Sequence, residues 1–155
     1  MKILIDADAL PVIAKELIIK TANRTQTMAV FVANRMTKLP PSPFLSYVVV
    51  GAGFDVADDY IINHIQAGDL VITSDIPLAN DVLEKGAKVL TARGEEFSKD
   101  NIKPRLNVRD FMESLRGTGV LDPKSMGGQK PYSNKDKIAF AGGLNRLVKP
   151  QNLSQ

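Results

Sequence analysis

Residues 68–78 read Gly-Asp-Leu-Val-Ile-Thr-Ser-Asp-Ile-Pro-Leu. The run at 70–73 predicts a short strand that is covered on both faces, as in a parallel sheet. Pro77 suits the first turn of a helix, where its missing N–H would have no partner. Asp75 stands at the junction, either to cap that helix or to offer a carboxylate at the end of the strand. The stretch therefore predicts a β–α unit with an acid at its turn.

The same alternation of short strands and helices runs along the chain. Strands are expected at 2–5, 28–33, 47–50, 70–73 and 88–90. Helices are expected at 11–23, 56–66, 77–85, 99–115 and 134–147, with a long loop at 117–131. This order predicts an α/β fold with a doubly wound, mostly parallel sheet of about five strands, flanked by helices in three layers. A length of 155 residues fits a single domain, 1–155.

The chain contains no cysteine. This excludes disulfides, thiol nucleophiles and sites that hold zinc or iron–sulfur clusters through cysteine, and it makes the cytoplasm the expected compartment. No apolar run approaches the roughly 18 residues of a membrane span, so no membrane partner is expected. Neither a P-loop nor a dinucleotide-binding glycine motif occurs.

Charge is unevenly distributed along the chain. Residues 1–98 carry 9 Lys and Arg against 12 Asp and Glu, whereas the region expected to be basic and helical, 99–155, carries 11 against 5. A basic flank beside an acidic centre suits a polyanion, so RNA or another nucleic acid is the expected partner. A solvated, lysine-rich C-terminal region would give the same counts.

Acidic residues follow two of the expected strands and open one helix. In doubly wound sheets, ligands bind beyond the carboxyl ends of the strands, where the strand order reverses. If strands 2–5 and 70–73 flank that point, the acids meet there and their mutual repulsion calls for a hard cation, Mg²⁺ or Mn²⁺. The candidate metal ligands are Asp6, Asp8, Asp58, Asp59 and Asp75, of which Asp6, Asp75 and Asp58 are also the candidate catalytic residues.

Each of these acids also has a plain structural interpretation. Asp8 and Asp75 are placed to cap helices, and a helix dipole favours acids in a first turn. Asp58 and Asp59 are about 100° apart on a helix, so one of them faces the cleft, and Asp58 is favoured. Asp6 and Asp8 share a face if the chain stays extended between them. Capping explains Asp6 least.

Four polar residues are candidates for substrate binding. Thr73 and Ser74 offer hydroxyls at the end of one strand, and Asn34 follows another directly. Arg93, just beyond strand 88–90, offers a guanidinium to a phosphate. Ordinary alternatives exist for two of them, because Asn is a common turn residue and Arg93 can pair with a neighbouring glutamate.

Many ordered motifs resemble those of the bacterial YaiI/YqxD family. They include Asp-Ala-Asp-Ala at 6–9, Gly-Phe-Asp-Val-Ala-Asp at 53–58, Gly-Asp-Leu-Val-Ile-Thr at 68–73 and Arg-Asp-Phe-Met at 109–112. The resemblance runs from residue 2 to about 147. It implies a PIN-like fold, related to metal-dependent ribonucleases, in which Asp6, Asp58 or Asp59, and Asp75 occupy acidic positions. Pro77 stands where such nucleases often carry a further acid, for which Asp8 or Asp81 would have to substitute.

Three functions remain open from the sequence. The first is a Mg²⁺- or Mn²⁺-dependent phosphodiesterase that cleaves RNA or another nucleic acid. The second is a module that binds RNA, a nucleotide or a protein without cutting, which the proline at position 77 favours. The third is a small-molecule phosphatase with Asp6 as its nucleophile, because some doubly wound phosphatases carry Asp-x-Asp after the first strand. A Ser-His-Asp triad is not expected, since His64, the single histidine, falls inside a helix.

Overall fold

The computed structural model describes residues 1–53, 56–106 and 131–150. The strands are β1 (Lys2–Asp6), β2 (Met28–Ala33), β3 (Leu45–Val49), β4 (Leu70–Ile72), β5 (Lys88–Leu90) and β6 (Glu96–Phe97). The labelled helices are α1 (Val12–Thr25), α2 (Val56–His64), α3 (Ile76–Glu84) and α5 (Asn134–Leu147). A further helix begins at residue 99, and its described part ends at 106. Most of the predicted loop 117–131 and the rest of the predicted helix 99–115 lie outside the described residues.

The strands form one sheet in the order β3-β2-β1-β4-β5-β6. All neighbours are parallel except β5 and β6, which are antiparallel. The chain builds outward from β1 to β3, then returns to β1 and builds the other half through β4 and β5. The predicted doubly wound sheet is confirmed, and its order reverses between β1 and β4. The sequence did not indicate β6, because two residues are too few to show a period.

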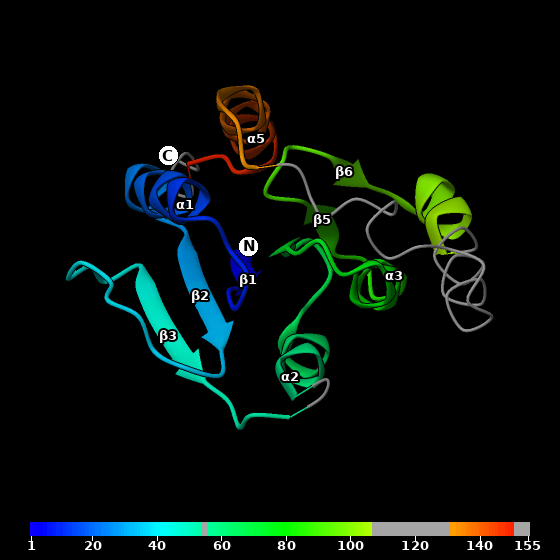
Figure 1. Ribbon diagram of the computed structural model, residues 1–155, viewed down its shortest axis with the longest axis horizontal. Coiled ribbons are helices and arrows are strands. Elements are labelled where there is room, and N and C mark those ends of the chain that lie inside the picture. Colours follow the sequence, from blue (N-terminus) through cyan, green and yellow to red (C-terminus); the bar gives the residue numbers. More distant parts are fainter. Residues whose placement is uncertain (54–55, 107–130, 151–155) are drawn as a thin grey trace.

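The two faces of the sheet carry separate cores. Alternate residues of β1 point to opposite sides, so that Ile3 and Ile5 pack with α1 and α5, whereas Leu4 packs with α2 and α3. Figure 1 shows α1 and α5 side by side on one side of the sheet and α2 with α3 on the other. This is the three-layer arrangement expected from the sequence.

Local signals set the helix boundaries. α3 begins directly after Asp75, whose carboxylate caps it, with a proline in its first turn. α5 begins after Ser133, which forms a reciprocal capping box with Asp136. α1 differs slightly from its prediction: Pro11 is its N-cap and no side chain caps it.

Asp69 joins the amino ends of β1 and β4, at the edge of the sheet opposite Asp75. Its carboxylate accepts hydrogen bonds from the backbone N–H of Lys2 (3.0 Å), the Lys2 ammonium (2.6 Å) and the backbone N–H of Gln66 (3.0 Å). Burial opposes its ionisation, but these contacts with Lys2 and Gln66 outweigh it and lower the pKa of Asp69. This carboxylate therefore stabilises the central strand pair.

We expect Asp69→Asn to lower the free energy of unfolding by about 1–3 kcal/mol at neutral pH. Because the folded-state pKa of Asp69 is lowered, its stabilisation is complete above the unfolded-state pKa of about 3.9 and is lost as the pH falls through the folded-state value. Urea unfolding at pH 7, 5 and 3 measures the difference, which should shrink at the lowest pH. The exposed Asp100→Asn is the control. An equal loss at all three pH values would show that the charge is not responsible.

Gly94 lets the β5–β6 turn lie directly against α5. Its φ is +89°, and a Cβ at this position would lie 2.5 Å from the carbonyl carbon of Ala139 in α5. The turn is closed by the backbone N–H of Gly94, which donates to the Thr91 carbonyl at 2.9 Å. Both the backbone conformation and the close contact therefore require glycine.

Gly94→Ala should lower the free energy of unfolding by about 2–4 kcal/mol, because strain at positive φ adds to a collision with backbone atoms. Gly68→Ala is the matched control, since Gly68 has the same φ of +89° but nothing within 4 Å of its added Cβ. Urea unfolding of both variants separates the cost of the strained backbone, which both share, from the cost of the collision with α5, which only Gly94→Ala has. If the two variants lose equal stability, the close packing of α5 on this turn contributes nothing.

Candidate functional site

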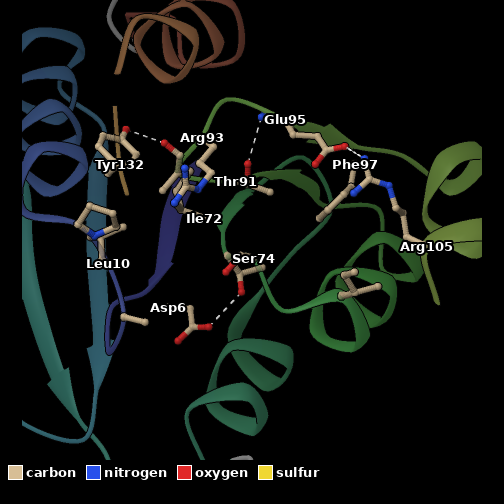
Figure 2. A pocket seen from close by; sticks show the side chains of 15 residues that line it. Asp6, Leu10, Ile72, Ser74, Thr91, Arg93, Glu95, Phe97, Arg105 and Tyr132 are labelled. Atoms are coloured by element: carbon tan, nitrogen blue, oxygen red, sulfur yellow. Dashed lines mark hydrogen bonds and ion pairs between the residues drawn. The ribbon is translucent and has the colours of Figure 1, made fainter. Parts of the chain in front are cut away.

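A cavity of about 220 Å³ lies at the carboxyl edge of the sheet, where the strand order reverses. Asp6 reaches it from the end of β1, Thr73 and Ser74 from the end of β4, and Arg93 from beyond β5. Figure 2 shows Asp6 on one side of this cavity and Arg93 on another. Ligands of doubly wound folds bind at this position. Four of the residues singled out from the sequence therefore line one cavity.

Besides Glu95, which pairs with Arg105, the acid that lines this cavity is Asp6. One of its oxygens, Oδ2, accepts a hydrogen bond from the Thr73 hydroxyl at 3.0 Å. Burial raises the pKa of Asp6, and the negative charges of Asp75 and Asp8 raise it further, against the lowering effect of the Thr73 hydrogen bond. Asp6 is therefore a carboxylate whose negative charge is poorly compensated, in a cavity open to a ligand.

Asp75 is held beside this cavity by its role at the start of α3. Its Oδ1 accepts from the backbone N–H of Leu78 at 3.0 Å, so the capping interpretation is correct. Its own backbone N–H donates to the Thr73 hydroxyl at 3.0 Å. The Thr73 hydroxyl thus accepts from Asp75 and donates to Asp6, and it fixes the two acids relative to one another.

Asp8 does not share a face with Asp6, contrary to the sequence expectation. The strand ends at Asp6 and the chain then turns, with the backbone N–H of Leu10 donating to the Ala7 carbonyl. The Asp8 carboxylate accepts from the backbone N–H of Asn34 at 2.9 Å and caps no helix. It lines a second cavity of about 360 Å³, on the other side of this turn.

Asp58 and Asp59 lie in the first turn of α2, as predicted, but neither lines a described cavity. α2 follows β3 and packs against β1, β2 and α3. Within residues 1–53, 56–106 and 131–150, no three His, Cys, Asp or Glu side chains are grouped so that they could hold a metal ion. The expected meeting of four or five carboxylates is therefore not found there.

Arg93 is positioned by two residues: Asp136 of α5, and Tyr132, which directly precedes the cap of that helix. Its guanidinium contacts Asp136 at 2.7 Å and lies 5.8 Å from the ring centroid of Tyr132. The Tyr132 hydroxyl donates to the Ala92 carbonyl at 2.6 Å, which anchors the ring. The alternative that Arg93 pairs with a neighbouring glutamate is not found, because Glu95 pairs with Arg105 and Glu96 with Arg146.

Two further residues of the cavity were missed in the sequence. Arg105 lies over the ring of Phe97, 5.7 Å from its centroid, and pairs with Glu95. Tyr132 supports Arg93 from the segment before α5. Nothing local marks either residue, since each reaches the cavity only through packing of distant segments. They add an aromatic ring and a guanidinium, which is paired with Glu95, to the lining of the cavity.

The other predicted residues lie elsewhere. Asn34 lines the second cavity and not the first. His64 ends α2, and its ring stacks on Tyr60 with 3.9 Å between the centroids. None of the helices in the described ranges is long and apolar enough to cross a membrane.

Comparison with known proteins identifies the family. The model of a family described as "Uncharacterized BCR, YaiI/YqxD family" matches residues 4–150. A UPF0178 protein of Psychrobacter cryohalolentis is 64% identical over 149 residues, which is 96% of this chain and all of that protein. A UPF0178 protein of Colwellia psychrerythraea is 49% identical and covers 96% of this chain and 95% of its own. No solved structure matches the chain. The chain therefore belongs to the YaiI/YqxD family, as its motifs indicated.

Proposed function

We propose that this protein is a divalent-metal-dependent phosphodiesterase that acts on RNA. One observation carries the proposal: the poorly compensated carboxylate of Asp6 faces the same cavity as Arg93 and Arg105, at the switch point of a doubly wound sheet. Perturbed carboxyl groups in such a cavity are typical of reactive centres. The arginines suit the phosphate of a substrate, whereas the acid suits a cation next to it.

The residues present fit Mg²⁺ or Mn²⁺. Mg²⁺ keeps several of its waters and is commonly held by one or two carboxylates together with substrate phosphates. Asp6 and Asp75 provide two such groups, linked through the Thr73 hydroxyl. A third protein carboxylate is thus not required, which accommodates Pro77 and the position of Asp58 on α2. A bound ion would activate water and offset charge on the scissile phosphate.

The chain's own residues supply orientation. Thr73 directs one oxygen of Asp6, and the capping bond to α3 directs one oxygen of Asp75. Arg93 is held by Asp136 and Tyr132, so its donors to a phosphate are oriented before the substrate arrives. Apolar side chains complete the wall and exclude water around the reacting phosphate: Leu10, Pro11, Ile72, Ile76 and Phe97.

The second candidate is a module that binds RNA without cutting it. It is favoured by the lack of a three-carboxylate group among the described residues and by proline at position 77. The same cavity and arginines would then bind phosphate, and Asp6 would have no catalytic role. Cleavage and metal binding separate the two candidates.

We expect Asp6→Asn and Asp75→Asn each to reduce metal-dependent RNA cleavage by about 100-fold or more. Asparagine still accepts the Thr73 hydrogen bond at position 6 and caps a helix as well as aspartate at position 75, so both variants should fold. Cleavage of a labelled single-stranded RNA with Mn²⁺ measures the effect, and circular dichroism checks folding. Asp100→Asn is the exposed control. Full cleavage by either site variant would exclude its carboxylate from the reaction.

Calorimetric titration with Mn²⁺ tests the metal directly. The unchanged protein should bind at millimolar Mn²⁺, and Asp6→Asn should weaken binding about tenfold or more because half of the carboxylate pair is lost. Asp8→Asn is a matched comparison, since Asp8 faces the other cavity and its loss should change the affinity by less than about threefold. Absence of any heat of binding in the unchanged protein would favour the binding module.

A further inference from the structure

The second cavity lies on the other side of the turn that follows β1. It has a volume of about 360 Å³ and is lined by Ala7, Asp8, Ala33, Asn34, Arg35, Thr37 and Tyr47. Asp6 and Asp8, which line different cavities, are two residues apart, so their Cα atoms are at most about 7 Å from one another. The two cavities are therefore close enough for adjoining units of one extended ligand.

Arg35 offers an uncommitted cation to this cavity. Five arginines lie in the described ranges, and four of them pair with side chains: Arg24 with Asn145, Arg93 with Asp136, Arg105 with Glu95 and Arg146 with Glu96. Arg35 makes no hydrogen bond or ion pair in this part of the chain, although Asp8 lines the same cavity. Its guanidinium donors are thus available to an anion.

Tyr47 provides an aromatic wall that is already fixed in place. Its ring stacks on the buried Phe31, with 6.1 Å between centroids and 14° between planes. Its hydroxyl accepts from Thr37 at 3.4 Å, and Thr37 itself accepts from the Lys15 ammonium at 2.7 Å. A fixed aromatic side chain next to a cation is the combination with which proteins bind unpaired bases of single strands.

We propose that the second cavity is a nucleotide subsite, with Arg35 on the phosphate and Tyr47 against the base. The proposal rests on the proposed function, and it deepens it: the substrate is single-stranded RNA of at least two nucleotides. One nucleotide lies in the cavity of Asp6 and its neighbour in the cavity of Arg35, on either side of the turn at 7–10. Paired bases of a duplex are not free to enter two separate cavities.

Calorimetry in the presence of EDTA tests the subsite without cleavage. The probes are a ribonucleoside monophosphate and a single-stranded RNA of about four nucleotides. The single-stranded RNA should bind more tightly than the monophosphate. Arg35→Gln should reduce this difference in affinity by about tenfold. The slope of log affinity against log salt should fall by about 0.7 for the strand, as expected for one lost phosphate contact. Lys20→Gln, which removes an exposed charge from α1, is the control.

Substitutions of Tyr47 test separately whether a base of the RNA stacks on its ring. Tyr47→Leu should weaken binding of the strand by about fivefold or more, whereas Tyr47→Phe, which keeps the ring, should bind within about twofold of the unchanged protein. The two substitutions differ in aromaticity and keep an apolar side chain on β3, so a difference between them reports stacking. Equal loss in both would overturn the assignment of Tyr47 to a base.

The outcomes separate this inference from the proposed function. If Arg35→Gln and Lys20→Gln bind the strand equally well, or the strand binds no better than the monophosphate, the second subsite is wrong. Asp6-dependent cleavage would in that case still support the phosphodiesterase. If Arg35→Gln loses the gain while the unchanged protein shows no metal-dependent cleavage, the subsite stands and the phosphodiesterase is wrong.

Discussion

The site depends on the pairing of β1 with β4. These strands lie side by side through Ile3–Leu70, Leu4–Val71 and Ile5–Ile72, and the three β1 residues are at most 1% exposed. Burial on both faces fixes their register, because a shift of one residue would turn each apolar side chain to the opposite core. This register places the end of β4 beside the end of β1, and so brings the Thr73 hydroxyl to Asp6. Without it, neither the acid pair nor the cavity would form.

The Thr73 hydroxyl links the start of α3 to the acid at the end of β1. Thr73 accepts from the backbone of Asp75 and donates to Asp6, so the same bonds that start α3 also orient the acid of β1. The two carboxylates stay near one another although burial and repulsion disfavour the charge on Asp6. Packing of the sheet holds them there, and a bound cation or donor group would relieve the repulsion. Asp75 caps α3 through its Oδ1, as its position before Pro77 predicts.

Features that depend on neighbours in sequence could be predicted, whereas features that depend on packing could not. The strand at 70–73, the cap at Asp75 and the capping box at Ser133 follow from residues within a few positions of one another. Arg93 meets Asp136 only because Gly94 lets α5 pack against its turn. Acids at a helix start look alike whether they cap or bind metal, so the sequence could not show that Asp58 and Asp59 do not line the cavity of Asp6. The PIN-like fold implied by the resemblance stays a prediction.

The turn after Asp6 has the largest consequence for function. An extended chain would have directed Asp6 and Asp8 to one ion, but the turn sends Asp8 to the backbone of Asn34 and divides the edge of the sheet into two cavities. The arginines of the two cavities also differ. Arg93 is already oriented by Asp136, so binding a phosphate costs it little conformational entropy, whereas Arg35 must lose that freedom on binding. Under the proposed function, the cavity of Asp6 would fix the reacting phosphate, and the cavity of Arg35 would accept neighbouring nucleotides of varied sequence and geometry.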